Sequence, residues 1–181
     1  MRLSLTLIAL AILGGCAAPV VTPRAYLDEE TAATITAVAK PWIFTAEESD
    51  FTAKDRDSLS LFAIDVNRMG DHRQYLAVLV SAPPRNSSSA AVTLELQGGA
   101  KSVSLQPATD EPRRLGIAKP LAPSYTLTAR WLYFPVSKEI LATVMRSSDL
   151  RAALVAGDKR IVYSMWRDGS AEIAELTSAL P

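Results

Sequence analysis

Two stretches in the first half of the chain are rich in apolar and β-favouring residues and are joined by a short polar segment. They read SLSLFAIDVN and QYLAVLVS, and RMGDHR connects them. Gly70 can adopt the positive φ that a tight reversal requires. A turn centred on Gly70 places Phe62 opposite Val78 and Ile64 opposite Leu76. The pattern therefore predicts an antiparallel hairpin with Phe62 and Ile64 on its core side.

Similar patterns recur toward the C-terminus. In AVTLELQGGAKSVSL, apolar and polar residues alternate on both sides of Gly98-Gly99, which predicts a second hairpin. SYTLTARWLYFPV is a further strand, and LRAALVA and KRIVYSMW flank Gly157-Asp158 as a third hairpin. The proline-containing stretch from Pro107 to Pro123 lacks a sustained period, so we expect it to cross between sheets or to cover an edge.

The segment from Thr34 to Phe44 mixes large apolar residues with Thr and Ala. Pro41 cannot donate a hydrogen bond to a central strand, so the segment is interpreted as an edge strand with a break. The acidic run Asp28-Glu29-Glu30 before it leaves a helix as the alternative.

Two short helices are predicted near the C-terminus. Ser137 can cap a first turn, and the apolar residues that follow it are spaced as on one helix face. Ile173, Leu176 and Leu180 mark a closing amphipathic helix. Short strands with frequent turns and without alternating strand–helix units favour a mainly β fold, an antiparallel β-sandwich or partly open barrel.

The N-terminus has the layout of a secretion signal. Arg2 precedes an apolar run of 11 residues from Leu3 to Leu13, and two glycines separate the run from Cys16. A membrane-spanning helix needs about 20 apolar residues, which this run does not reach. An ordinary secreted protein with a free or buried cysteine would share these features.

Leu13-Gly14-Gly15-Cys16 resembles the lipobox of bacterial lipoproteins. The resemblance covers the leader alone. It implies that residues 1–15 are removed and that Cys16 becomes acylated. It also implies anchoring in the cell envelope, and Ala17 after the cysteine is similar to the signal for the outer membrane, with the domain facing the periplasm. Residues 16–27 are then a lipidated tether and residues 28–181 a single β-rich domain.

Composition and charge set limits on the partners. The chain has 19 basic and 19 acidic residues, so its charge does not favour nucleic acid or an anionic surface. The one cysteine leaves no disulfide if it is acylated. We expect a membrane partner through the anchor, an envelope protein as a possible second partner, and no nucleic acid.

The sequence offers little catalytic chemistry. It contains no GxSxG, HExxH or CxxC motif, and His72 is its only histidine. His72 is either a base or pH-sensing group or, as we expect, a solvated turn residue. Carboxylates that could hydrolyse a glycosidic bond without histidine cluster around one loop and strand: Asp50, Asp55, Asp57 and Asp65. No catalytic residue, cofactor or metal ligand is assigned, and the protein is not expected to be an enzyme.

The turn of the first hairpin is the most distinctive polar segment. An exposed Arg and Met beside a glycine turn could anchor a protein partner, and we assign possible contact to Asn67, Arg68, Met69 and His72. A plain solvated turn is the alternative.

Large aromatic residues elsewhere, at Trp42, Trp131, Trp166, Tyr125, Tyr133 and Tyr163, are expected mainly in the core. The resulting hypothesis is a lipid-anchored binding or assembly module; a ligand-capture or enzyme-inhibitor module and, more remotely, a carboxylate hydrolase are the alternatives.

Overall fold

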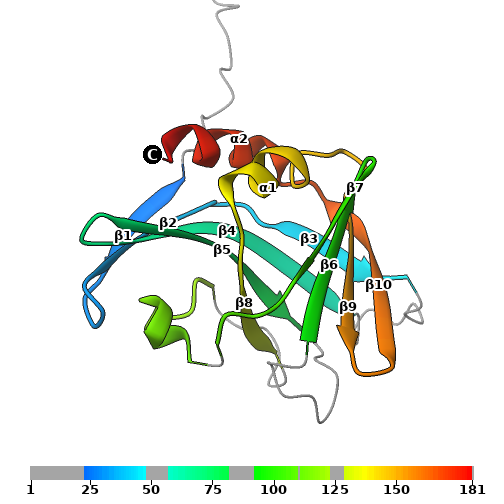
Figure 1. Ribbon diagram of the computed structural model, residues 1–181, viewed down its shortest axis with the longest axis horizontal. Coiled ribbons are helices and arrows are strands. Elements are labelled where there is room, and N and C mark those ends of the chain that lie inside the picture. The colour runs from blue at the N-terminus through cyan, green and yellow to red at the C-terminus, as the bar shows by residue number, and fades with distance from the viewer. Residues whose placement is uncertain (1–22, 48–56, 82–91, 110, 123–128, 181) are drawn as a thin grey trace, which may run out of the picture.

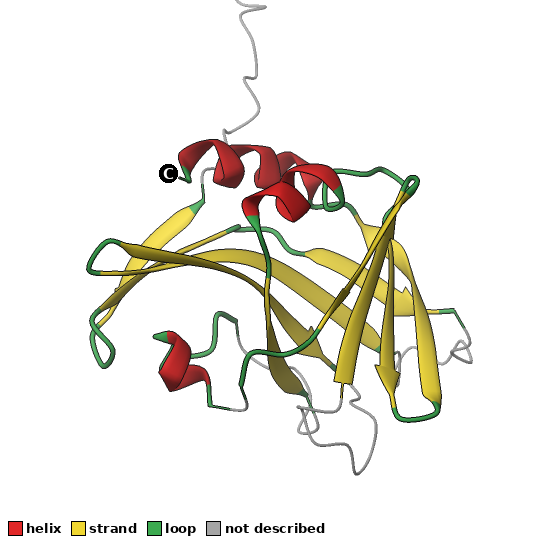
Figure 2. Cartoon of the chain, in the orientation of Figure 1, coloured by secondary structure: helices red, strands yellow, loops and turns green. Residues whose placement is uncertain are grey.

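The computed structural model describes residues 23–47, 57–81, 92–109, 111–122 and 129–180. Within these residues, ten strands form one open antiparallel sheet, and two short helices lie at one end of it (Figures 1 and 2). The strands are β1 (Arg24–Asp28), β2 (Ala33–Ala37), β3 (Trp42–Ala46), β4 (Ser58–Arg68), β5 (Asp71–Val80), β6 (Val92–Gly98), β7 (Lys101–Leu105), β8 (Arg130–Pro135), β9 (Arg151–Ala156) and β10 (Lys159–Arg167). The helices are α1 (Lys138–Thr143) and α2 (Ser170–Ala179). The predicted fold class is confirmed: mainly β, with antiparallel strands and two short helices near the C-terminus.

β4 is the strand from which the rest of the sheet branches. One of its edges pairs with β5 along the whole hairpin, and β5 pairs in turn with β8. The other edge is shared, because Ser58–Leu61 pair with β3 and Ile64–Asn67 pair with β2. Beyond β2 lies β1, whereas β3 continues through β10 and β9 to β6 and β7.

The break predicted at Pro41 is present, but the edge position is wrong. Pro41 lies in the gap between β2 and β3, where no ladder hydrogen bond is needed from its nitrogen. Both strands are interior, because β2 lies between β1 and β4 and β3 lies between β4 and β10. A short irregular segment thus removes the constraint that proline would impose on a continuous central strand.

The sheet curls until its two ends approach each other (Figure 1). The chain leaving β7 passes beside β8, where the Ala108 N–H donates a hydrogen bond of 2.8 Å to the Tyr133 carbonyl. Within the described residues, the segment that follows β7 thus reaches β8, the strand at the other end of the sheet.

The register of the β4–β5 hairpin differs from the prediction by one residue. Phe62 lies opposite Ala77 rather than Val78, and Ile64 lies opposite Tyr75 rather than Leu76. The cause is the turn, in which Met69 and Gly70 are the two central residues. Arg68 and Asp71 consequently form the last pair of the ladder.

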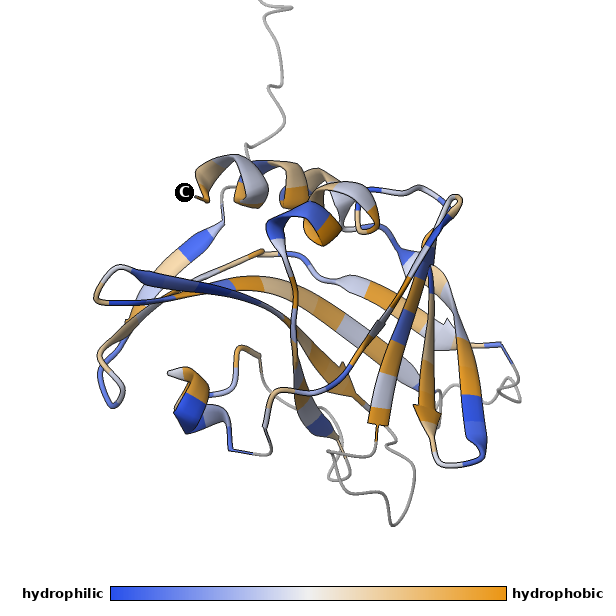
Figure 3. Ribbon diagram, in the orientation of Figure 1, coloured by the Kyte–Doolittle hydropathy of each residue, from blue (hydrophilic) through white to orange (hydrophobic). Residues whose placement is uncertain are grey.

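The inner face of the curled sheet forms the core, together with the two helices. Its fully buried side chains come from strands on both sides of β4 and include Trp42, Phe44, Leu59, Leu61, Leu76, Leu94, Phe134 and Tyr163. Helix α1 contributes Leu141, and helix α2 contributes Ile173 and Leu176. The predicted cap is confirmed, since the Ser137 side chain accepts a hydrogen bond from the Ile140 N–H. Figure 3 shows apolar residues concentrated along the strands and polar residues toward several turns.

Part of the outer face is covered by the segment that follows β7. Its 3₁₀ helix, Pro112–Leu115 (η2), ends at Gly116, which has φ +93°. A Cβ there would lie 3.1 Å from the Val66 side chain, so the backbone lies close against β4. Buried Asp28 holds this segment, since its carboxylate accepts hydrogen bonds from Glu30, Thr31 and Ala118 N–H groups.

The hydrogen bonds to Asp28 also set its acidity. Desolvation by burial acts to raise the pKa of Asp28, but the hydrogen bonds from the Ala118, Thr31 and Glu30 backbone and the Thr31 side chain outweigh it. The pKa therefore lies below its ordinary value. The ionised carboxylate is the form that stabilises this contact between the β1–β2 turn and the covering segment.

Residues 24–27, which the sequence places in the tether, form most of β1. The leader with Cys16, together with Asp50, Asp55 and Tyr125, lies outside the described residues. Within the described ranges, no helix is both long and apolar enough to span a membrane.

Candidate binding site at the β4–β5 hairpin

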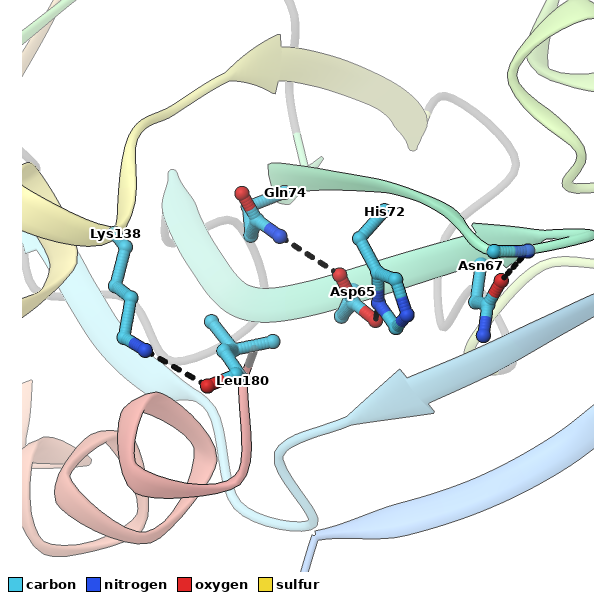
Figure 4. Close-up of polar contacts among 7 residues, drawn as sticks. Asp65, Asn67, His72, Gln74, Lys138 and Leu180 are labelled. Carbon is cyan, nitrogen blue, oxygen red and sulfur yellow. Dashed lines mark hydrogen bonds and ion pairs between the residues drawn. The ribbon is translucent and has the colours of Figure 1, made fainter.

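The tip of the β4–β5 hairpin is a two-residue turn with positive φ at both central positions. Met69 has φ +54° and Gly70 has φ +93°, values that fit a type I′ turn. The side chain of Asn67 fixes the turn, because its Oδ1 accepts a hydrogen bond of 2.8 Å from the Gly70 N–H (Figure 4). Asn67 therefore supports the tip.

Met69 is an unusual residue for this position. A side chain in the left-handed region normally costs about 1–2 kcal/mol, and glycine, asparagine and aspartate are the residues that adopt it most readily. Met69 is also fully exposed, so it recovers none of this cost by packing within the described domain. The turn thus holds a long, adaptable apolar side chain in solvent.

Three arginines surround the outer side of the tip. Arg68, Arg73 and Arg114 line a hollow of about 200 Å³ together with Leu115. Arg73 is paired with Asp71, and Arg114 is paired with Glu111. The hydrogen bond that Arg73 donates to the Asp71 carboxylate, and then the negative charge of Asp71, raise the pKa of Arg73.

Arg68 differs from its two neighbours. The Arg68 Cδ packs beside Gly116, and among the described residues no side chain or carbonyl accepts a hydrogen bond from its guanidinium. The outer side of the tip therefore combines an exposed methionine with a cation that an incoming carboxylate could bind.

On the inner side, a polar network fixes the base of the hairpin. Asp65 is buried, and its carboxylate accepts a hydrogen bond of 2.8 Å from Gln74 Nε2. Its other oxygen lies 2.7 Å from His72 Nδ1 (Figure 4). His72 belongs to β5 and its side chain is 30% exposed, so the expectation of a solvated turn residue is wrong. The true register explains this contact, because it places Asp65, His72 and Gln74 on one face.

The same view shows how the two helices are joined. Lys138 Nζ, at the start of α1, donates a hydrogen bond of 2.7 Å to the Leu180 carbonyl directly after α2 (Figure 4). This contact ties the end of the chain to the first helix.

The histidine–aspartate contact does not by itself make a catalytic site. Nothing in the described part of the chain groups three or more His, Cys, Asp or Glu side chains so that they could hold a metal ion. Asp57 and Asp65 are eight positions apart along an extended chain, about 26 Å at 3.3 Å per residue. This separation exceeds the roughly 5–9.5 Å between the carboxyl groups of glycosidases.

The four residues predicted for partner contact therefore have two different roles. Arg68 and Met69 are exposed at the tip, whereas Asn67 and His72 make hydrogen bonds that hold its shape. Sequence reasoning missed Arg114 and Asp65 as neighbours of the tip. Arg114 comes from a segment more than forty positions away, and no local pattern connects it to the hairpin.

The aromatic residues divide in a similar way. Trp42, Tyr133 and Tyr163 are buried as expected. Trp166 is 66% exposed, and it lies at the point where the pairing of β10 with β3 shifts between Met165 and Arg167. Alternation along the strand gives no sign of this irregularity.

Comparison with protein-family models, with curated proteins and with solved structures finds no significant match to this chain. The roles of the hairpin residues therefore rest on their geometry.

Proposed function

We propose that this protein is a lipid-anchored binding module of the bacterial envelope, which contacts a protein partner through the tip of its β4–β5 hairpin. The anchor is an acylated Cys16, as the lipobox resemblance implies, and the membrane is the outer membrane with the domain in the periplasm. The surface that contacts the partner is formed by Arg68 and Met69.

The conformation of Met69 is the observation that carries this proposal. Met69 raises the energy of the turn and exposes apolar carbon to water, and such strained, exposed positions are typical of functional contacts. The Asp65–His72–Gln74 network and the Asn67 hydrogen bond hold the tip in one shape. A preorganised tip loses less conformational entropy when it binds.

The direction of the strands supports this role. β1 and β4 run in the same direction, because each is antiparallel to β2. Arg24, at the start of β1, pairs with Ala37 of β2, and Ala37 pairs in turn with Ile64 of β4. Arg24 and Ile64 therefore lie at the same level along the strand axis. Met69 lies five residues beyond Ile64, about 17 Å farther along the strand axis. The tip therefore projects beyond the level at which the tether joins β1.

The surface chemistry defines the kind of partner. Met69 suits a shallow apolar pocket, and Arg68 suits a carboxylate at the rim of that pocket. Arg73 and Arg114 are already paired with acidic residues, so they add hydrogen-bond donors with little net charge. We infer a folded envelope protein that presents an acidic group next to an apolar depression.

Photo-crosslinking in cells tests the proposal. A photoreactive amino acid at position 69 should give a discrete crosslinked product, whereas the same residue at Asp158, in the β9–β10 turn, should not. Arg68→Glu in the same chain should abolish the product, because it places like charges together. Equal products from both positions, no product at position 69, or a product that survives Arg68→Glu would contradict the proposal.

The anchor is tested separately with Cys16→Ser. Serine cannot replace the thiol in the lipid modification, so mass spectrometry of the membrane fraction should find acylated wild-type protein and no acylated variant. An unmodified N-terminus elsewhere in the wild-type chain would rule out the anchor.

A further inference from the structure

The outer face of the sheet carries a groove with an apolar floor and two arginines at its rim. It has a volume of about 520 Å³ and lies over β1 to β5. Its floor includes Ile43, Phe62 and Leu79, and its rim includes Arg24 and Arg167. We call it the β1–β5 groove. Its composition suits an elongated molecule with an apolar body and an anionic end.

The two rim arginines are available for an anion. Both are exposed, and neither guanidinium has a hydrogen-bond or ion-pair partner among the residues that the structure describes. A second groove, on the outer face of β6, β9 and β10, gives an internal comparison. It has a similar volume of about 510 Å³, but its Arg160 is paired with Glu95.

The position of Arg24 limits how far the β1–β5 groove can lie from an acylated Cys16. Eight residue steps separate the two, and a fully extended chain covers at most about 29 Å in that number. A domain of this size is about 40 Å across. The tether is therefore too short for Arg24 to lie on the side of the domain that faces away from the bilayer.

We propose that the β1–β5 groove binds an anionic phospholipid of the bilayer that carries the anchor. The acyl carbons lie over Ile43, Phe62 and Leu79, and the phosphate lies between Arg24 and Arg167. Arginine forms charge-assisted hydrogen bonds with phosphate, and apolar burial of the chain adds to the contact. This inference rests on the proposed anchoring at Cys16. It adds a second, non-covalent contact that fixes the orientation of the domain on the membrane.

Trp166 provides the reporter for a test, since it adjoins Arg167 and is 66% exposed. Acylated protein purified from membranes is reconstituted into vesicles of phosphatidylglycerol with brominated acyl chains, which quench nearby tryptophan fluorescence. Subtracting the signal of Trp166→Phe isolates this residue from Trp42 and from Trp131, which packs against Phe62. We expect quenching in these vesicles and much weaker quenching in brominated phosphatidylcholine.

The double variant Arg24→Gln, Arg167→Gln should lower the equilibrium constant for the contact about thirtyfold, at about fivefold per arginine near an anionic surface. The control is Arg151→Gln, Arg160→Gln, which removes the same charge from the second groove and should leave quenching unchanged. Absence of quenching, equal quenching in both lipids, or equal loss in both double variants would overturn the inference.

The outcome also separates this inference from the proposed anchor. Acylated protein whose Trp166 is not quenched would overturn the lipid site alone. Wild-type protein recovered without an acyl chain would instead overturn the anchor on which the inference rests.

Discussion

Replacing Met69 with asparagine should make the domain more stable and at the same time remove partner binding. Met69 has φ +54° and is fully exposed, so the substitution removes no packing and relieves part of a backbone penalty of about 1–2 kcal/mol. Asn-Gly is the preferred pair for a type I′ turn. We expect a gain of about 0.5–1 kcal/mol, which raises the Tm of a domain of this size by about 1–4 °C.

Thermal unfolding followed by circular dichroism measures this change, and Met69→Ala is the matched control. Alanine removes the same side chain without the tolerance of asparagine for positive φ, so it should leave the Tm nearly unchanged. Both variants should lose the crosslinked partner when the photoreactive residue is placed at neighbouring Asp71, which is exposed and leaves Arg68 in place. A fall in Tm for Met69→Asn would show that the methionine packs against the protein, and full retention of the partner would refute its role in binding.

Two further predictions concern stability. Because the pKa of Asp28 is lowered by folding, its carboxylate stabilises the protein above its ordinary pKa of about 3.9 and this contribution is lost as pH falls below that value. Asp28→Asn should thus have a lower urea midpoint than wild type at pH 7, and the difference should shrink toward pH 3; a difference independent of pH would contradict the assignment. Gly98→Ala should be destabilising by about 1–3 kcal/mol in urea titrations, since its Cβ would lie 2.6 Å from the Val144 carbonyl oxygen, and an unchanged midpoint would show that the end of β6 moves freely away from the segment after α1.

The sequence predicts elements well where only one face of a strand is buried. In β6, Val92, Leu94 and Leu96 are buried and the residues between them are not, so alternation identifies both the strand and its inner face. In β4, by contrast, all residues from Leu61 to Val66 are buried, because the core covers one face and the η2 segment helps to cover the other. With both faces apolar, the pattern cannot distinguish two registers that differ by one residue.

The turn was the feature that decided between these registers. The sequence pattern places Gly70 at its centre, but the structure uses Met69 as well, and methionine gives no local sign of positive φ. The error also concealed the polar network, since the expected register pairs Asp65 with Tyr75 rather than Gln74. The exposed part of the candidate site, Arg68 and Met69, could be found from composition beside the glycine, while its supporting contacts depended on the register.

The pairing of β3 with β10 has a consequence for how the chain reaches its native state. Phe44 meets Met165, which follows it by about 120 residues, so this edge of β3 stays without its partner until nearly the whole polypeptide is present. Such long-range pairing is typical of proteins that fold in milliseconds to seconds rather than microseconds. During that interval Trp42 and Phe44 are exposed on an unpaired strand, a state prone to aggregation. A newly synthesised chain would therefore benefit from a holding chaperone until its last strand is available to pair.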